Sequence, residues 1–199
     1  MSPTFSMNNK TISRSMLAGN TPTAYAYDSI ATTTISTAGT VTFNSIPQTY
    51  KHLQVRIMAR GTTAAASYNP ITVRVGNGSA DGGTNYYPHH SVYGNGTTAI
   101  ADYYGGLYSY AFTGWIPTVL TTTQGFGIAV IDILDYTSVN KHKTLRSLFG
   151  WDANGTGWSG LTSSLWMPTT KVAIDTMVLS VNATDNFLAN SVVALYGIK

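Results

Sequence analysis

The chain has 199 residues, a formal net charge of +3 at pH 7 and no cysteine, which excludes a disulfide framework, thiolate-bound zinc and a thiol nucleophile. Charged residues make up only 10% of the chain, and all eight acidic residues are aspartates. Threonine, glycine, serine, tyrosine and valine dominate, which favours strands over helices. At this length we expect one domain, alone or with an arm.

The eleven lysines and arginines are scattered, so the contiguous basic stripe of a nucleic-acid-binding protein is missing. We therefore predict no nucleic-acid partner. The chain contains no run of about 18 apolar residues, which predicts no membrane span. Residues 1–20 lack the apolar region and cleavage site of a signal peptide.

Residues 1–27 differ from the rest because isolated apolar residues lie between Ser, Thr, Asn and Pro without a sustained period. These apolar residues are Phe5, Ile12, Met16 and Leu17. One interpretation is a flexible terminus. The other is an extended arm that docks these four residues on a neighbouring subunit and becomes ordered only on assembly.

Strand signals begin at Asp28, so residues 28–199 are predicted to form the folded domain. Residues 30–36 and 39–43 favour a hairpin. Residues 50–60 alternate most clearly. Their inward residues would be Leu53, Val55, Ile57 and Ala59, and their outward residues would be His52, Gln54, Arg56, Met58 and Arg60.

Another alternating run, residues 71–75, leads into a glycine-rich loop at residues 76–83. Residues 86–115 then set aromatic rings between glycines, which predicts an irregular region with rings in the core and at a surface or interface. Further runs lie at residues 107–115, 126–136, 161–167, 171–181 and 191–198. About ten strands without a convincing helix predict an all-β fold, an antiparallel β-sandwich of jelly-roll type with an extended N-terminal arm. An immunoglobulin-like sandwich is the alternative, although its Cys and Trp pattern is missing.

Residues 131–157 combine two alternating runs with most of the charge in the middle of the chain. We interpret them as a β-hairpin. Asp132 and Asp135 on the first run can face Arg146 on the second, which contributes about 0.2–1 kcal/mol and helps to fix the register.

The connection within this hairpin, residues 137–143, is polar and is therefore predicted to lie outside the core. It carries Lys141, His142 and Lys143. We expect Lys141 and Lys143 to form a contact surface for a partner.

No constellation in the sequence predicts catalysis or metal binding. The four histidines have no ligand spacing, and Asp132 and Asp135 fall on opposite faces of a strand. Residues 152–157 imitate the first half of a calcium loop, but the twelfth position is Ser163 instead of a glutamate, so we expect a glycine-rich turn. The nucleophile motif G-x-S-x-G is absent. The sequence thus predicts a non-enzymatic protein without catalytic residues, metal or cofactor.

Three tryptophans allow two interpretations. Trp151, Trp158 and Trp166 are candidates for an exposed carbohydrate-binding platform, but packing in a β-sandwich core is the favoured interpretation.

Three segments, in the same order, resemble a family of small virion structural proteins of tailed bacteriophages. They are FNSIPQTYKHLQVRIMAR (43–60), DILDYTSVNKHKTLRSLFGWDANGTG (132–157) and SVVALYGIK (191–199). The resemblance covers residues 28–199 and leaves out the arm. It implies a place on the outer surface of the virion, as a capsid decoration or cement protein that bridges subunits of the major capsid protein. It also implies a homo-oligomer, a trimer by analogy. The alternative is a tail- or fibre-associated domain that binds host-surface glycans.

Overall fold

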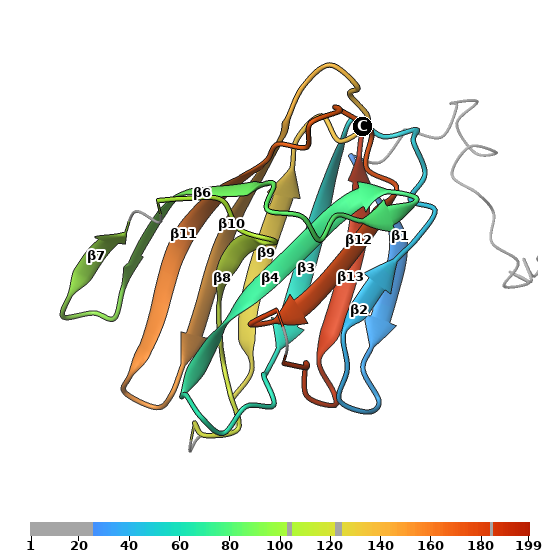
Figure 1. The fold of residues 1–199 in the computed structure, drawn as a ribbon. Coiled ribbons are helices and arrows are strands. Elements are labelled where there is room, and N and C mark those ends of the chain that lie inside the picture. The colour runs from blue at the N-terminus through green and yellow to red at the C-terminus, as the bar shows by residue number, and fades with distance from the viewer. Residues whose placement is uncertain (1–25, 103–104, 122–124, 184) are drawn as a thin grey trace, which may run out of the picture.

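The computed structural model describes residues 26–102, 105–121, 125–183 and 185–199. The described residues form strands and no helix, which confirms the all-β prediction (Figure 1). The strands are β1 (Tyr27–Thr34), β2 (Val41–Phe43), β3 (His52–Ala59), β4 (Tyr68–Asn77), β5 (Ser79–Ala80), β6 (Tyr86–Gly94), β7 (Ala99–Asp102), β8 (Ala111–Pro117), β9 (Gly127–Ile133), β10 (Lys143–Asp152), β11 (Gly157–Trp166), β12 (Thr176–Val181) and β13 (Val192–Ile198). The region predicted to be irregular, residues 86–115, therefore contains β6 and β7.

Two antiparallel sheets pack face to face, so the predicted antiparallel β-sandwich is confirmed. The larger sheet has eight strands in the order β1-β13-β3-β9-β10-β11-β6-β7. The smaller sheet has the order β2-β12-β4-β5, and β8 also pairs with β4. Figure 1 shows β4, β8 and β12 in front of the larger sheet. The jelly-roll connectivity stays a prediction.

Alternating residues of both sheets fill the space between them. The predicted inward residues of β3 are all buried, and the alternation predicted for residues 71–75 also places its apolar residues inside. The buried set from the central strands is Leu53, Val55, Ile57, Ala59, Ile71, Val73, Val75, Ala129, Ile131, Ile133, Met177, Leu179 and Val181. Period-2 patterning therefore predicted the core side of β3 and of residues 71–75 correctly.

The predicted hairpin of residues 30–36 with 39–43 is wrong. β1 pairs with β13 in the larger sheet, whereas β2 pairs with β12 in the smaller sheet. The chain crosses between the sheets at Ile35, whose backbone N–H donates to the Ser191 carbonyl at 2.9 Å. Both partner strands lie near the C-terminal end of the sequence, so the local pattern contains no sign of them.

The start of the domain also shifts slightly. Tyr27 is the first residue of β1 and lies in register with Ile198, so the strand begins one residue before the predicted boundary at Asp28. The four apolar residues assigned to the arm, Phe5, Ile12, Met16 and Leu17, lie outside the described residues.

Arg60 was predicted to face outward with the polar side of β3, but it is buried. It follows the last residue of the strand, so the alternation no longer fixes its direction. Its guanidinium donates from Nε to the Thr118 carbonyl at 2.9 Å and from Nη2 to the Thr121 carbonyl at 2.7 Å. Backbone carbonyls of a neighbouring connection thus provide hydrogen bonds that make burial of this charge tolerable.

Asp81 fastens the glycine-rich loop at residues 76–83. Its carboxylate accepts hydrogen bonds from Trp166 Nε1, Asn85 Nδ2 and the Gly83 backbone N–H, each at 2.8 Å. Desolvation raises the pKa of Asp81, but the three hydrogen bonds favour the charged form and hold the pKa below its ordinary value of 3.8. The loop is therefore tied to the end of β11.

The free energy of unfolding should depend on the charge of Asp81. Because its folded-state pKa lies below the unfolded value of 3.8, its stabilising contribution is present well above pH 3.8 and is lost as the pH falls through the folded-state pKa. Because solvent partly screens this carboxylate, we expect Asp81→Asn to lower the free energy of unfolding by only about 0.5–1.5 kcal/mol at neutral pH. Urea titrations measure the free energy of unfolding of both proteins. The difference between the variant and the wild type should become smaller below pH 3.8. A difference that does not change with pH would contradict this assignment.

Candidate functional site

The outer face of the larger sheet, which points away from the smaller sheet, carries large exposed aliphatic side chains. Five of them are between 46% and 61% exposed: Met58, Val92, Ile128, Leu148 and Leu161. We call these five residues the apolar band. They lie on β3, β6, β9, β10 and β11, which are consecutive neighbours in the sheet.

The strand register brings the members of the apolar band together. Met58 lies opposite Ile128, and Leu161 lies between Leu148 on one side and Val92 on the other. Val130, opposite Leu148, joins the two parts of the band. Directly paired residues on one face of a sheet have Cβ atoms about 4.5–5.5 Å apart, so these side chains form one continuous surface.

A polar network flanks the apolar band on the same face. Asp132 accepts a hydrogen bond from Gln54 Nε2 at 2.9 Å, and Arg146 Nη2 lies 3.4 Å from its other carboxylate oxygen. Gln54 in turn accepts from Arg56 Nε at 2.8 Å, and the Arg56 guanidinium lies 4.5 Å from the centre of the Tyr196 ring. The prediction that Arg146 faces Asp132 is therefore confirmed. The same prediction for Asp135 is wrong, because Asp135 lies beyond the end of β9 and pairs with Lys141.

A shallow hollow of about 360 Å³ opens at the end of this face. It forms where Gly150, Ser159 and Gly94 lie side by side in register, so that small residues replace the large side chains of the band. The band reaches this hollow because Ile128 pairs directly with Gly150. Together, the band and the hollow form an apolar ridge next to a recess. Side chains of a partner can pack on the ridge and fill the recess.

The turn that borders the hollow contains the calcium-like half-motif. Asn154 and Gly155 have φ values of +62° and +108°, and the Gly155 N–H approaches Asp152 Oδ1 at 3.4 Å. These are the properties of a hairpin turn held by an aspartate side chain, as expected. Among the described residues, no three His, Asp or Glu side chains gather in a way that would hold a metal ion.

The two lysines of the connection at residues 137–143 differ in their exposure to solvent. Lys141 is 68% exposed and pairs with Asp135 at 3.1 Å, and this pairing lowers the pKa of Asp135. Lys143 was predicted to be a contact residue, but it is only 1% exposed. Its Nζ donates to the Ser138 and Lys141 carbonyls at 2.5 and 2.7 Å, and burial lowers its pKa. The loop folds back over Lys143, so of these two lysines only Lys141 remains available to a partner.

Charge reversal should separate these two lysines. Lys143→Glu places an acid against two carbonyl oxygens in a buried site, and we expect it to lower the free energy of unfolding by at least about 3 kcal/mol. Lys141→Glu removes an exposed ion pair that solvent screens, so its free energy of unfolding should stay close to that of the wild type. Urea denaturation of both variants measures the difference. Equal, small effects would contradict the buried position of Lys143.

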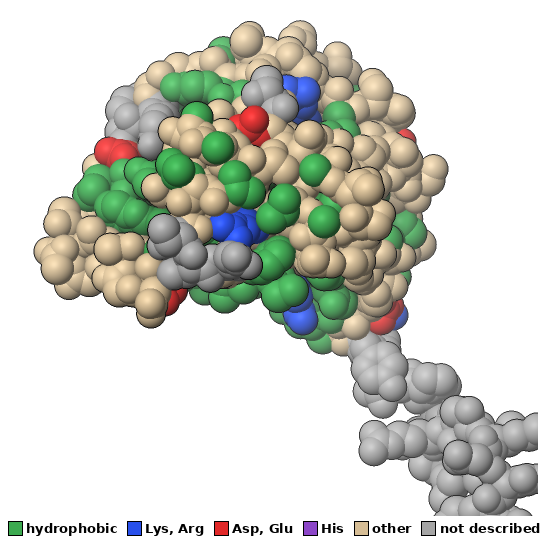
Figure 2. Space-filling model, turned by 90° about the horizontal axis from the view of Figure 1, so that it is seen from below, with side chains coloured by type: hydrophobic (Ala, Val, Ile, Leu, Met, Phe, Trp, Pro, Cys, Tyr) green, Lys and Arg blue, Asp and Glu red, His purple; other side chains and the backbone are tan. Residues whose placement is uncertain are grey.

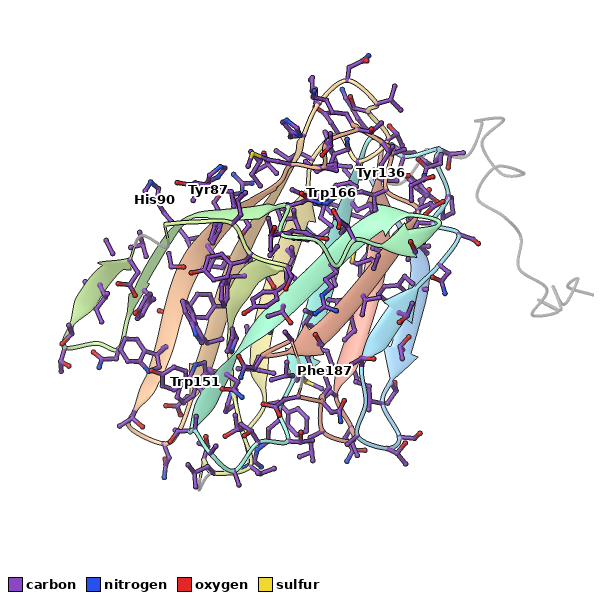
Figure 3. The ribbon with its side chains drawn as sticks, in the orientation of Figure 1. Tyr87, His90, Tyr136, Trp151, Trp166 and Phe187 are labelled. Carbon is purple, nitrogen blue, oxygen red and sulfur yellow. The ribbon has the colours of Figure 1, made fainter. Side chains whose placement is uncertain are left out.

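The tryptophans favour the core interpretation over the platform. Trp166 and Trp151 are buried between the sheets (Figure 3). Trp158 is partly buried and packs against the core. The sequence contained one usable sign of the apolar band, because residues 127–131 and 145–149 include apolar residues on both sides of their strands, and such runs occur where both faces are covered.

In comparisons with known proteins, no family model, no curated protein and no solved structure matches this chain. The described residues contain no helix with the length and apolarity needed to cross a membrane.

Proposed function

We propose that the protein is a non-enzymatic structural component of a bacteriophage virion, a capsid decoration or cement protein that attaches through the outer face of its larger sheet. The apolar band is the observation that carries this proposal. An exposed apolar surface rimmed by polar residues is characteristic of a protein–protein interaction site. The resemblance of three segments to virion structural proteins supports the phage particle as the setting.

The size of the face suits such a contact. Eight strands spaced about 4.8 Å apart and about eight residues long cover about 900 Å². A standard interface buries about 800 Å² on each partner. The band supplies apolar area, and Arg56, Arg146 and Tyr196 supply the residue types that are enriched at interface centres.

The proposed partners are the major capsid protein or another virion protein, together with further copies of this chain. A homo-oligomer, with a trimer as the proposed state, would multiply modest contacts into stable attachment on the outer surface of the particle. Residues 1–25 are proposed to add a second contact. A truncation that tests them should end at residue 25, because Tyr27 already belongs to β1.

The proposal is tested by the location and copy number of the protein in purified particles. Quantitative mass spectrometry of particles with and without tails should give a copy number in proportion to the major capsid protein, retained in tailless capsids. Absence from particles would contradict the proposal. A copy number in proportion to a tail protein would favour the tail- or fibre-associated alternative. That alternative now depends on Trp158 for glycan contact, since Trp151 and Trp166 are buried.

A further inference from the structure

Four aromatic side chains enclose a separate cavity of about 90 Å³. Tyr68 on β4 and Trp115 on β8 come from the smaller sheet, and Tyr93 on β6 and Trp158 on β11 come from the larger sheet. Figure 2 views the molecule from the end at which Trp151 lies in Figure 3, and hydrophobic side chains gather over part of this surface. Tyr68 is 41% exposed, so the cavity is reachable from solvent on its side.

The rings stand as walls at steep angles to one another. The Tyr93 ring lies 4.9 Å from that of Trp115 and 5.1 Å from that of Trp158, with interplanar angles of 50° and 64°. The Tyr68 ring lies 6.2 Å from that of Trp158 at 54°. Trp115 is braced from behind by Phe149 at 5.1 Å. The four rings thus border one small space from several directions.

The chemistry of the lining suits a positively charged occupant. The face of an aromatic ring carries the negative part of its quadrupole. The Tyr93 hydroxyl donates to Asp102 Oδ2 at 2.5 Å, so a carboxylate stands behind one wall. None of the four lining side chains carries a positive charge. A cation is therefore the favoured occupant.

The lining also selects among cations and neutral ligands. A sugar ring or a primary ammonium group would need several hydrogen-bond partners. The four lining side chains offer only two tyrosine hydroxyls and two indole N–H groups, and the Tyr93 hydroxyl already donates to Asp102. A quaternary ammonium group has no hydrogen-bond donor to satisfy and binds by cation–π attraction and dispersion. We infer that Tyr68, Tyr93, Trp115 and Trp158 form an aromatic cage that binds a quaternary ammonium group, such as that of choline or a trimethylated lysine.

Ligand titrations followed by proton–nitrogen NMR test this site on the intact protein. Choline and tetramethylammonium should shift the indole N–H signals of Trp115 and Trp158. The Trp166 indole, bonded to Asp81, should not move and serves as the internal reference. The matched ligand control is the neutral analogue in which a tert-butyl group replaces trimethylammonium. It should bind at least about tenfold more weakly, because it keeps the shape and loses the charge.

Two variants and two further ligands complete the experiment. Trp158→Ala should abolish the choline response, and Tyr93→Phe should weaken it because it removes the hydroxyl that links the cage to Asp102. Choline-lipid vesicles and a trimethyl-lysine peptide distinguish the source of the group. Equal binding of choline and its neutral analogue would overturn the inference, as would tighter binding of methyl glucoside than of choline. The comparison of choline with its neutral analogue on the wild-type protein tests the inference even where a variant fails to fold. Its outcome does not depend on the proposed virion role.

Discussion

Replacing Leu148 with aspartate is expected to abolish incorporation of the protein into particles and to leave its fold intact. Leu148 is 58% exposed at the centre of the apolar band, so the free protein should lose no more than about 1 kcal/mol of unfolding free energy. In a closed interface the same carboxylate would lose its hydration without a partner, which costs several kcal/mol. Incorporation is measured by quantifying the protein in particles assembled with the variant as the only copy.

The matched control is Leu107→Asp. Leu107 is 52% exposed, comparable to Leu148, but it lies in the connection before β8, outside the strands that carry the apolar band. This change introduces the same charge at a similarly exposed aliphatic residue, and incorporation should remain normal. If Leu148→Asp is incorporated like the wild type, the band is not the attachment surface.

Gly114→Ala is expected to be strongly destabilising, because a positive φ and a close contact coincide at this glycine. Gly114 has φ of +114°, where a residue with a side chain is strained by about 1–3 kcal/mol. An added Cβ would also lie 2.7 Å from Phe149 Cβ, and overpacking of this kind costs a further 1–3 kcal/mol or so. We expect the free energy of unfolding measured in urea to fall by about 2–6 kcal/mol, a large part of the roughly 5–15 kcal/mol that stabilises a typical domain.

Gly155→Ala separates the two causes. Gly155 has a similar φ, +108°, but an added Cβ would have no neighbour within 4 Å. It should therefore show only the backbone cost, about 1–3 kcal/mol. Equal losses in the two variants would mean that contact with Phe149 contributes nothing. Because Phe149 braces Trp115, Gly114→Ala should also weaken choline binding to the aromatic cage.

Local patterns predicted the parts of the fold that depend on alternation. Leu53, Val55 and Ile57 are buried as expected because their strand has a polar and an apolar side. The hairpin around residues 131–157 was predicted for the same reason, and Asp132 does face Arg146. By contrast, β1 and β2 pair with β13 and β12, which lie far along the chain, and no short window of sequence contains that information.

The candidate sites were harder to predict because they are tertiary. Lys143 has a charge that normally stays in water, yet loop carbonyls satisfy it in a buried position. The apolar band needs the register of five strands, and alternation within one strand does not show it. The aromatic cage combines Tyr68, Tyr93, Trp115 and Trp158 from four strands of two sheets, and the sequence showed only that the region is rich in rings.

The most direct measurement is a cryo-EM map of the particle at a resolution that orients the domain. We expect the outer face of the larger sheet to lie against a neighbouring subunit, with Leu148 and Leu161 buried in the contact and the aromatic cage open to solvent. A map in which every copy turns the apolar band toward solvent and attaches by another face would contradict the proposed mode of assembly.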